Sequence, residues 1–416
     1  MPAFRRLWAS QLVSEVGDWS ARLVLSVLVY ARTGSAAATG LVTTASLVPW
    51  LGPGQLLTGL SERWPRRRVM VVADLARAAA FTAAVAPLPV WVLLGVVFFA
   101  GLATPPFEAA RSALRPEVVP AALFGAAVSL SSITQDLTLA GGYAAGGVLV
   151  AWLGARAALL VNALSFGVSA VLLAGLPRLR APRQGRVGVT ALVEGWQALR
   201  RDPLIVRAVL LVTASMLAAS SLVALAAPLV LHVLAAGPAR VGALVALAGV
   251  VSIVATTAVP TEADPVRLLR WAAGFALTGG AVLTSCMVWV SLGSAGVLAE
   301  ARTGLSVLAF AAAGLLFAVI APANVVVSPR LPAGVRASAL SLLLGALVAT
   351  EAAGAAAAGA AAALVGLLPV CAALGLPPLA VGAYALLRPR TSAPPAGPGA
   401  DSTTTNIQAD HPKNPS

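Results

Sequence analysis

Long apolar stretches, separated by short polar segments, dominate the pattern along the chain. A helix rises ~1.5 Å per residue, so ~20 apolar residues cross the ~30 Å hydrocarbon core of a bilayer. Stretches this long favour helices, which satisfy their own backbone hydrogen bonds in lipid. The pattern predicts an all-α membrane protein with twelve transmembrane helices near 8–30, 36–58, 69–88, 90–110, 124–150, 155–176, 205–231, 241–259, 269–291, 304–326, 337–361 and 364–387.

Basic residues gather in alternate polar segments. Cytoplasmic loops of membrane proteins retain Lys and Arg. With the N-terminus in the cytoplasm, 22 of the 28 basic residues lie in segments predicted to be inside, four lie outside and two lie within helices. The single lysine, Lys413, beside abundant Ala and Arg is typical of a bacterial genome of high GC content. We therefore expect a multi-pass protein of a bacterial inner membrane with both termini in the cytoplasm.

The longest internal polar segment divides the predicted helices into two sets of six. Glycines repeat between the sets: Gly142, Gly147 and Gly154 map onto Gly354, Gly359 and Gly366 at an offset of 212 residues, and Gly40 onto Gly242 at 202. The other interpretation is that Ala- and Gly-rich helices resemble one another by composition. We expect an N-terminal half (1–176), a cytoplasmic linker (177–204), a C-terminal half (205–388) and a polar, disordered cytoplasmic tail (389–416).

The composition of the chain argues against several classes of function. The chain is 59% hydrophobic and has a net charge of +13. A nucleic-acid binder would collect such charge on one soluble face, whereas here it lies between apolar spans, so no nucleic-acid partner is expected. Cys286 and Cys371 lie inside predicted spans, as small core residues do, and His232 and His411 cannot form a metal site alone. We expect no cofactor and no metal. The absence of a phosphate-binding Gly-x-x-x-x-Gly-Lys-Ser/Thr loop argues against a built-in ATP motor, and the scarcity of His argues against an enzyme.

Ionisable residues inside predicted spans are the candidate functional residues, because a charge in the membrane is costly. Glu15, Asp18 and Arg22 have spacings of 3 and 4, so they share one helix face. Asp136 and Glu351 also lie deep in their spans. We expect Asp18 to pair with Arg22 and Glu15 to be the easier acid to protonate. A purely structural ion pair, and a packing hydrogen bond from Glu351, are the alternative interpretations.

A basic segment between the second and third predicted helices carries the most specific motif. Thr58–Met70 contains Gly59, Glu62, Arg63, Arg66, Arg67 and Arg68. It resembles the Gly-x-Leu-Ala-Asp-Arg-x-Gly-Arg-Arg signature of the major facilitator superfamily. Glu62 stands where that family has Asp, Pro65 where it has Gly, and Gly59 lies one place late. The resemblance implies a cytoplasmic gate. Asp74 and Arg77 lie near the cytoplasmic end of the third predicted helix, so we expect them to be partners of the basic segment, and we expect Glu108 and Arg111 to orient the inner end of the fourth.

Further stretches resemble one branch of that superfamily, the macrolide-efflux and enterobactin-exporter-like transporters. They are Phe4–Trp8, Gly17–Trp19, Ala73–Ala78, Ala110–Pro120, Asn162–Phe166 and Leu199–Leu204. The resemblance covers residues 4 to about 210, and the second half keeps the outline through Asn324, Pro332 and Arg336. Drug antiporters of the superfamily carry Gly-Pro-x-x-Gly-Gly in their fifth helix. Here Gly142, Gly146 and Gly147 are present with Tyr143 in place of Pro, which fits either close helix packing or the antiporter motif.

Together the pattern and the resemblance predict a secondary active transporter of the major facilitator fold. We expect proton-coupled efflux of a small amphipathic compound, a drug, secondary metabolite or siderophore, by a monomer in the lipid bilayer. An importer and a transport-dead sensor of the same fold are the alternatives.

Overall fold

The computed structural model describes residues 2–57, 64–120, 123–176, 189–260, 264–292, 299–332 and 336–387. These residues are nearly all helical, and none of them lies in a strand. The first-half elements are α1 (Pro2–Thr33), α2 (Ala36–Leu47), η1 (Val48–Leu51), α3 (Pro53–Leu56), α5 (Arg66–Ala83), α6 (Val90–Leu102), α7 (Thr104–Val118) and α8 (Phe124–Ala174).

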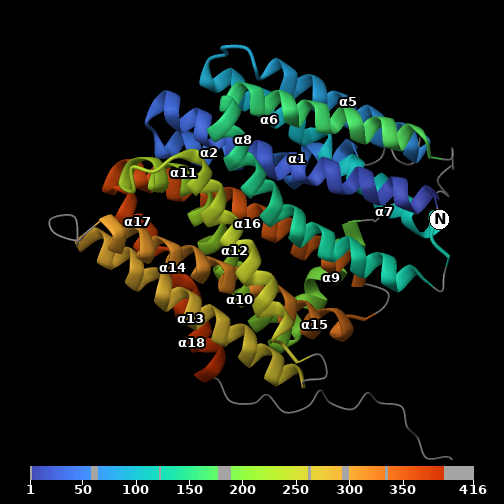
Figure 1. Ribbon diagram of the computed structural model, residues 1–416. Coiled ribbons are helices and arrows are strands. Elements are labelled where there is room, and N and C mark those ends of the chain that lie inside the picture. Colours follow the sequence, from blue (N-terminus) through green and yellow to red (C-terminus); the bar gives the residue numbers. More distant parts are fainter. Residues whose placement is uncertain are drawn as a thin grey trace, which may run out of the picture.

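The linker contains one described helix, α9 (Val189–Arg201). The second-half elements are α10 (Pro203–Ala224), α11 (Ala226–Pro228), η4 (Leu229–Val233), α12 (Pro238–Thr257), α13 (Pro265–Leu292), α14 (Ala299–Ala318), α15 (Ile320–Arg330), α16 (Arg336–Val365), α17 (Leu367–Ala373) and α18 (Leu376–Leu387). Proline begins several helices, where its missing N–H costs no hydrogen bond. Figure 1 shows the blue-to-green first half above the yellow-to-red second half.

Among the described residues, eight helices are long and apolar enough to cross a membrane, and Ala36–Leu51 is a shorter apolar helix. The first helix, α1, is not one of the eight, because Glu15, Asp18 and Arg22 interrupt its apolar run. Helical segments lie within every range expected from the sequence, whereas the number of twelve crossings stays a prediction. Trp152 and Leu364 are 83% and 86% exposed, as side chains facing lipid would be.

Two glycines mark equivalent turns in the two halves. Gly154 joins the two arms of α8 with φ 79° and ψ 163°, and Gly366 joins α16 to α17 with φ 95° and ψ 155°. Positive φ is open to glycine because it lacks a Cβ. These are the glycines that the sequence repeat pairs at an offset of 212. Their shared backbone conformation is what an internal repeat of structure requires.

The buried apolar core joins the halves at one end of the molecule. One cluster combines first-half residues such as Val24 and Val42 with second-half residues such as Leu222 and Val245. At the opposite end each half has a separate cluster, around Met70 and Leu114 in the first and around Ile205, Leu269 and Val327 in the second. We call these the joined end and the opposite end. Among the described residues, the buried core shared by the two halves therefore lies at the joined end.

The linker and tail are described in part. Residues 177–188 and 388–416 lie outside the described residues, whereas α9 shows that the last part of the predicted linker is helical. Leu199 of α9 packs in the second half's own cluster. The domain boundaries expected from the sequence remain predictions.

Candidate functional site

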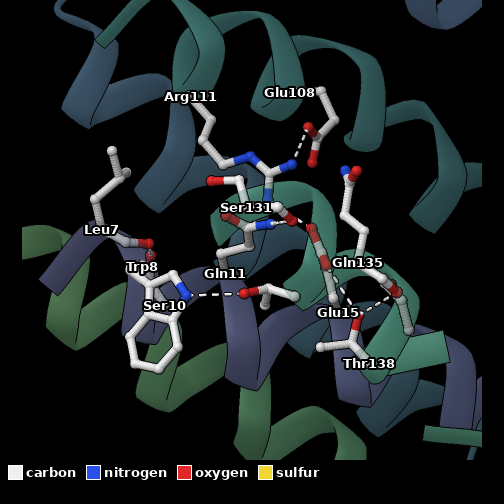
Figure 2. A network of polar contacts seen from close by, with 12 residues as sticks. Leu7, Trp8, Ser10, Gln11, Glu15, Glu108, Arg111, Ser131, Gln135 and Thr138 are labelled. Carbon is white, nitrogen blue, oxygen red and sulfur yellow. Dashed lines mark hydrogen bonds and ion pairs between the residues drawn. The ribbon is translucent and has the colours of Figure 1, made fainter. Parts of the chain in front are cut away.

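The acidic face of α1 lies against α7 and α8 within the first half. The Nη1 atom of Arg111 in α7 donates to Glu15 at 2.6 Å, and its Nη2 atom donates to Glu108 at 2.6 Å. Thr138 of α8 donates its hydroxyl to the other oxygen of Glu15 at 3.0 Å. The Arg111 side chain is 2% exposed. One buried guanidinium thus links two carboxylates from different helices, as Figure 2 shows.

Polar contacts continue from this cluster along α1 toward the opposite end. Trp8 donates its indole N–H to Thr134 at 2.9 Å, and Gln11 donates its amide to the Ser131 carbonyl at 3.4 Å (Figure 2). All these acceptors lie on α8, at spacings of three to four residues that keep them on one face with Thr138. The pairs fix the register of α1 against α8 and hold Glu15 in place.

A second buried arginine pairs with Asp18, which lies one turn after Glu15 on α1. Arg77 of α5 donates to Asp18 at 3.0 Å and also pairs with Asp74, which is fully buried on its own helix. Its guanidinium lies over the rings of Phe107 and Phe166 at 4.5 and 4.6 Å, a cation–π geometry. Arg77 therefore contacts side chains from α1, α5, α7 and α8.

The expected ion pair of Asp18 with Arg22 is wrong. Asp18 pairs with Arg77 instead, and the Arg22 guanidinium lies over the Trp19 ring at 4.5 Å. The side chain of Glu351 in the second half is half-buried and lies close enough to Arg22 to interact with it electrostatically. Arg22 thus lies near groups of both halves, whereas Glu15 and Asp18 pair with arginines of the first. Asp136 lies in α8, but its side chain is outside the described residues.

Sequence reasoning missed the roles of two arginines. Arg111 does more than orient the end of its helix, because it bonds to Glu15, and Arg77 pairs with α1 rather than serving the basic segment. The spacing of three in Asp74–Arg77 and Glu108–Arg111 was a signal of local pairing. Partners on α1 depend on how distant helices pack, and a single sequence carries no sign of this.

A small pocket opens beside Asp18. Its volume is about 50 Å³, and it is lined by residues of α1, α2, η1, α5, α6 and α7, among them Asp18, Arg22, Trp50, Arg77 and Phe81. The Asp18 side chain is 30% exposed. This carboxylate is therefore within reach of water or of a ligand, whereas that of Asp74 is sealed.

The described arginines of the basic segment bind helix ends of their own half. Arg67 donates to the carbonyls of Ala174 and Leu176 at 3.0 and 2.9 Å, at the C-terminal end of α8. Arg66 pairs with Glu117 of α7. Cations stabilise the C-terminal ends of helices, whose last carbonyls lack partners. Arg68 lies over Trp64 at 5.0 Å, whereas Gly59, Glu62 and Arg63 are outside the described residues.

The glycines of α8 lie at two close helix contacts. A Cβ on Gly142 would lie 2.6 Å from Cβ of Trp19, and one on Gly146 would lie 2.9 Å from the Ser20 carbonyl, both on α1. A Cβ on Gly147 would lie 2.9 Å from Cα of Gly242 on α12, in the other half. The equivalent Gly359 packs on Ala36 and Ala37 of α2. Two symmetry-related glycine contacts thus bring the halves together at the joined end.

The overall arrangement matches that of known transporters. The nucleoside transporter NupG aligns with a TM-score of 0.72 at 12% identity, covering 92% of this chain and 99% of that one. A bacterial homologue of the human lysosomal transporter Spinster, in an inward-facing and unoccupied conformation, aligns with a TM-score of 0.71 at 13% identity, covering 92% and 96%. At such identities the likeness shows the fold alone. It is the fold of a multi-pass membrane transporter of the major facilitator superfamily.

Sequence comparison places the chain within that superfamily. It matches the transmembrane secretion effector family over residues 1–400 and belongs to it. It is 29% identical to the major-facilitator-type transporter YfiS of Bacillus subtilis over 211 residues, 49% of this chain and 51% of YfiS. It is 32% identical to macrolide efflux protein A of Streptococcus pyogenes over 124 residues (28% and 30%) and 30% identical to the multidrug efflux pump Tap of Mycobacterium tuberculosis over 188 residues (42% and 44%). The matches span about half of these relatives' lengths, or less. Family and fold are those of membrane transporters rather than enzymes.

Proposed function

We propose that the protein is a secondary active transporter that exports a small amphipathic compound in exchange for protons. The observation that carries this proposal is the pairing of Glu15 and Asp18, on one face of α1, with the buried arginines Arg111 and Arg77. A charge in the membrane is costly unless it is paired. A movement of α1 against α5 and α7 within the first half that separates a carboxylate from its arginine would therefore favour uptake of a proton and would couple helix movement to proton binding.

The packing of the halves supports a cycle of alternating access. A shared core at the joined end and separate cores at the opposite end are what a state open toward the opposite end requires. The opposite end carries the basic residues Arg66, Arg67 and Arg330. By the positive-inside rule that end faces the cytoplasm, so this state would be inward-facing. Rocking of one half against the other would then open the joined end.

The direction of transport is proposed from the relatives, two of which are named as efflux proteins. An importer of the same fold is the main rival, since fold does not fix direction. A transport-dead sensor is less favoured, because Asp18 reaches a pocket instead of being enclosed wholly by helix contacts.

Proteoliposomes with an imposed pH gradient test the proposal. Probe accumulation, with erythromycin and ethidium as probes, and proton flux, read from an entrapped pH dye, are followed for the wild type, Glu15→Gln, Asp18→Asn, Asp136→Asn and Glu351→Gln. The control is Glu300→Gln, because Glu300 is exposed at the start of α14. We expect Glu15→Gln and Asp18→Asn to lose accumulation against the gradient and the control to keep it. If probe accumulation depends on the pH gradient in all four variants as it does in the wild type, these acids have a structural role only.

A further inference from the structure

A second, larger pocket lies in the other half of the molecule, between α10, α15 and α16. Its volume is about 270 Å³. The lining residues come from all three helices, and those of α16 include Leu340, Leu344 and Leu347. None of these described residues is charged, and Thr213 and Asn324 contribute the polar side chains. The pocket is therefore suited to an apolar group, with an amide at its edge for one hydrogen bond.

The position of the pocket on α16 indicates that it opens between the halves. Leu340, Leu344 and Leu347 are spaced by four and three residues, and Glu351 follows four residues later, so all share one helix face. Glu351 lies within electrostatic range of Arg22 in the first half. The next residue, Ala352, accepts a hydrogen bond from Thr44 of α2 at 3.0 Å. This part of α16 therefore faces the first half.

The pocket also lies toward the end where the halves have separate cores. Ala208, Ala323 and Val327 belong both to its lining and to the second half's own cluster. A ligand could thus enter it in the present state without first parting the shared core. Thr44 and the packed glycines close the path beyond Glu351, toward the joined end.

The size of the pocket suits only part of a drug-sized molecule. Sites for whole ligands of that size measure ~300–1,000 Å³. The remainder of a ligand would extend along α16, and Glu351 lies seven residues, or about 10 Å, beyond Leu344. Glu351 is the one acidic residue in the sequence of α10, α15 and α16. A positive group on the ligand could therefore pair with it.

We propose that this pocket binds the apolar group of a cationic amphipathic substrate, whose positive group lies about 10 Å away beside Glu351. The inference rests on the proposed function and adds the substrate class and the residues that select it. The two halves then have different roles. The first half holds the paired acids and arginines of α1, α5 and α7, and the second recognises the apolar body.

Equilibrium binding to the full-length protein in lipid nanodiscs tests the inference without any gradient. The probes are a phenylalkyl trimethylammonium ion, with ring and nitrogen about 10 Å apart, and the neutral phenylalkyl alcohol of the same length. Leu344→Trp fills the pocket, and Leu364→Trp makes the same change at a position of the same helix that is 86% exposed and outside the pocket lining. Empty nanodiscs correct for partition into lipid.

We expect the wild type to bind the ammonium ion more tightly than the alcohol. Leu344→Trp should weaken both probes at least tenfold, Glu351→Gln should reduce the ammonium affinity to that of the alcohol, and Leu364→Trp should match the wild type. Equal binding by Leu344→Trp and Leu364→Trp would refute the pocket. If Glu351→Gln still binds the ammonium ion more tightly than the alcohol, the positive group does not lie beside Glu351. If the wild type binds neither probe, the proposed substrate class is refuted. Binding as expected without transport would refute the proposed function alone.

Discussion

Replacing Gly147 with alanine should push the two halves apart at the joined end. Gly147 of α8 packs directly on α12, and a Cβ there would lie 2.9 Å from Cα of Gly242, 3.0 Å from the Pro238 carbonyl and 3.1 Å from the Gly242 nitrogen. All three atoms belong to the backbone, so no side chain can rotate out of the way. Because ordinary contacts of this kind span 3.4–4 Å, the two helices must separate by roughly half an ångström.

The energetic effect can be bounded from this geometry. Overpacking of a well-packed contact costs about 1–3 kcal/mol. The cost applies to the state in which α8 touches α12, and a state with the joined end open avoids it. A difference of ~1–3 kcal/mol corresponds to a 5- to 150-fold shift in the equilibrium between the two states. Gly141→Ala is the matched control on the same helix, because a Cβ there meets nothing within 4 Å.

Distances between spin labels can report this shift. One label is attached to Ala31→Cys in the first half and the other to Ala239→Cys in the second, both exposed at the joined end, with the buried Cys286 and Cys371 replaced by Ala. Gly147→Ala should move the distance distribution toward longer values, whereas Gly141→Ala should leave it unchanged. The reasoning fails if the two glycine variants give the same distribution while both remain folded.

Three further predictions concern the buried charges and the basic segment. Arg77→Ala leaves Asp18 and Asp74 without their partner and should lower the free energy of unfolding by ~3–5 kcal/mol. The loss is measured as a lower unfolding midpoint in detergent, and the midpoint of Arg77→Lys should lie between those of the wild type and Arg77→Ala. Thr138→Val removes the hydroxyl that donates to Glu15 and should cost ~1.5–3 kcal/mol in the same assay. Arg67→Ala removes the donor to two carbonyls of α8 and should slow turnover in proteoliposomes while membrane insertion stays normal.

Each of these variants has a matched control in the chain. Arg156→Ala changes an exposed arginine, Thr82→Val changes an exposed threonine that donates to its own helix, and Arg68→Ala changes the neighbour that lies over Trp64. Arg77 and Thr138 are structurally unimportant if their variants unfold at the same temperatures as the controls. Transport by Arg67→Ala at the wild-type rate, with equal expression, would contradict a role in gating.

The sequence predicted the parts of this structure that depend on local pattern. Apolar runs located the helices, because a span must satisfy its backbone within one continuous segment. The glycine repeat paired Gly154 with Gly366, and the structure gives both a positive φ, which strongly constrains residue type, although Gly366 lay inside the expected span 364–387. The three charges of α1 stood out because a charge in a span is costly.

The partners of those charges could not be predicted in the same way. Asp18 was expected to pair with Arg22 four residues on, but a buried carboxylate finds its partner wherever packing provides one. Here packing brings Arg77, 59 residues away, to Asp18 and Arg111, 96 residues away, to Glu15. Such pairings depend on helix rotation and register, which a single sequence does not contain.

The ion pairs of α1 also constrain when this helix can insert into the membrane during synthesis. α1 is synthesised before α5 and α7, yet three charges, Glu15, Asp18 and Arg22, lie within its predicted span, and each adds ~2.5–3.5 kcal/mol to the cost of insertion near the membrane centre. Arg77 and Arg111 are translated 59 and 96 residues after Asp18 and Glu15. Until α5 and α7 arrive, α1 lacks the partners that neutralise its acids. Its stable entry into the bilayer should therefore wait for them, so a nascent chain that stops before α5 would leave α1 at the membrane surface or with the insertion machinery.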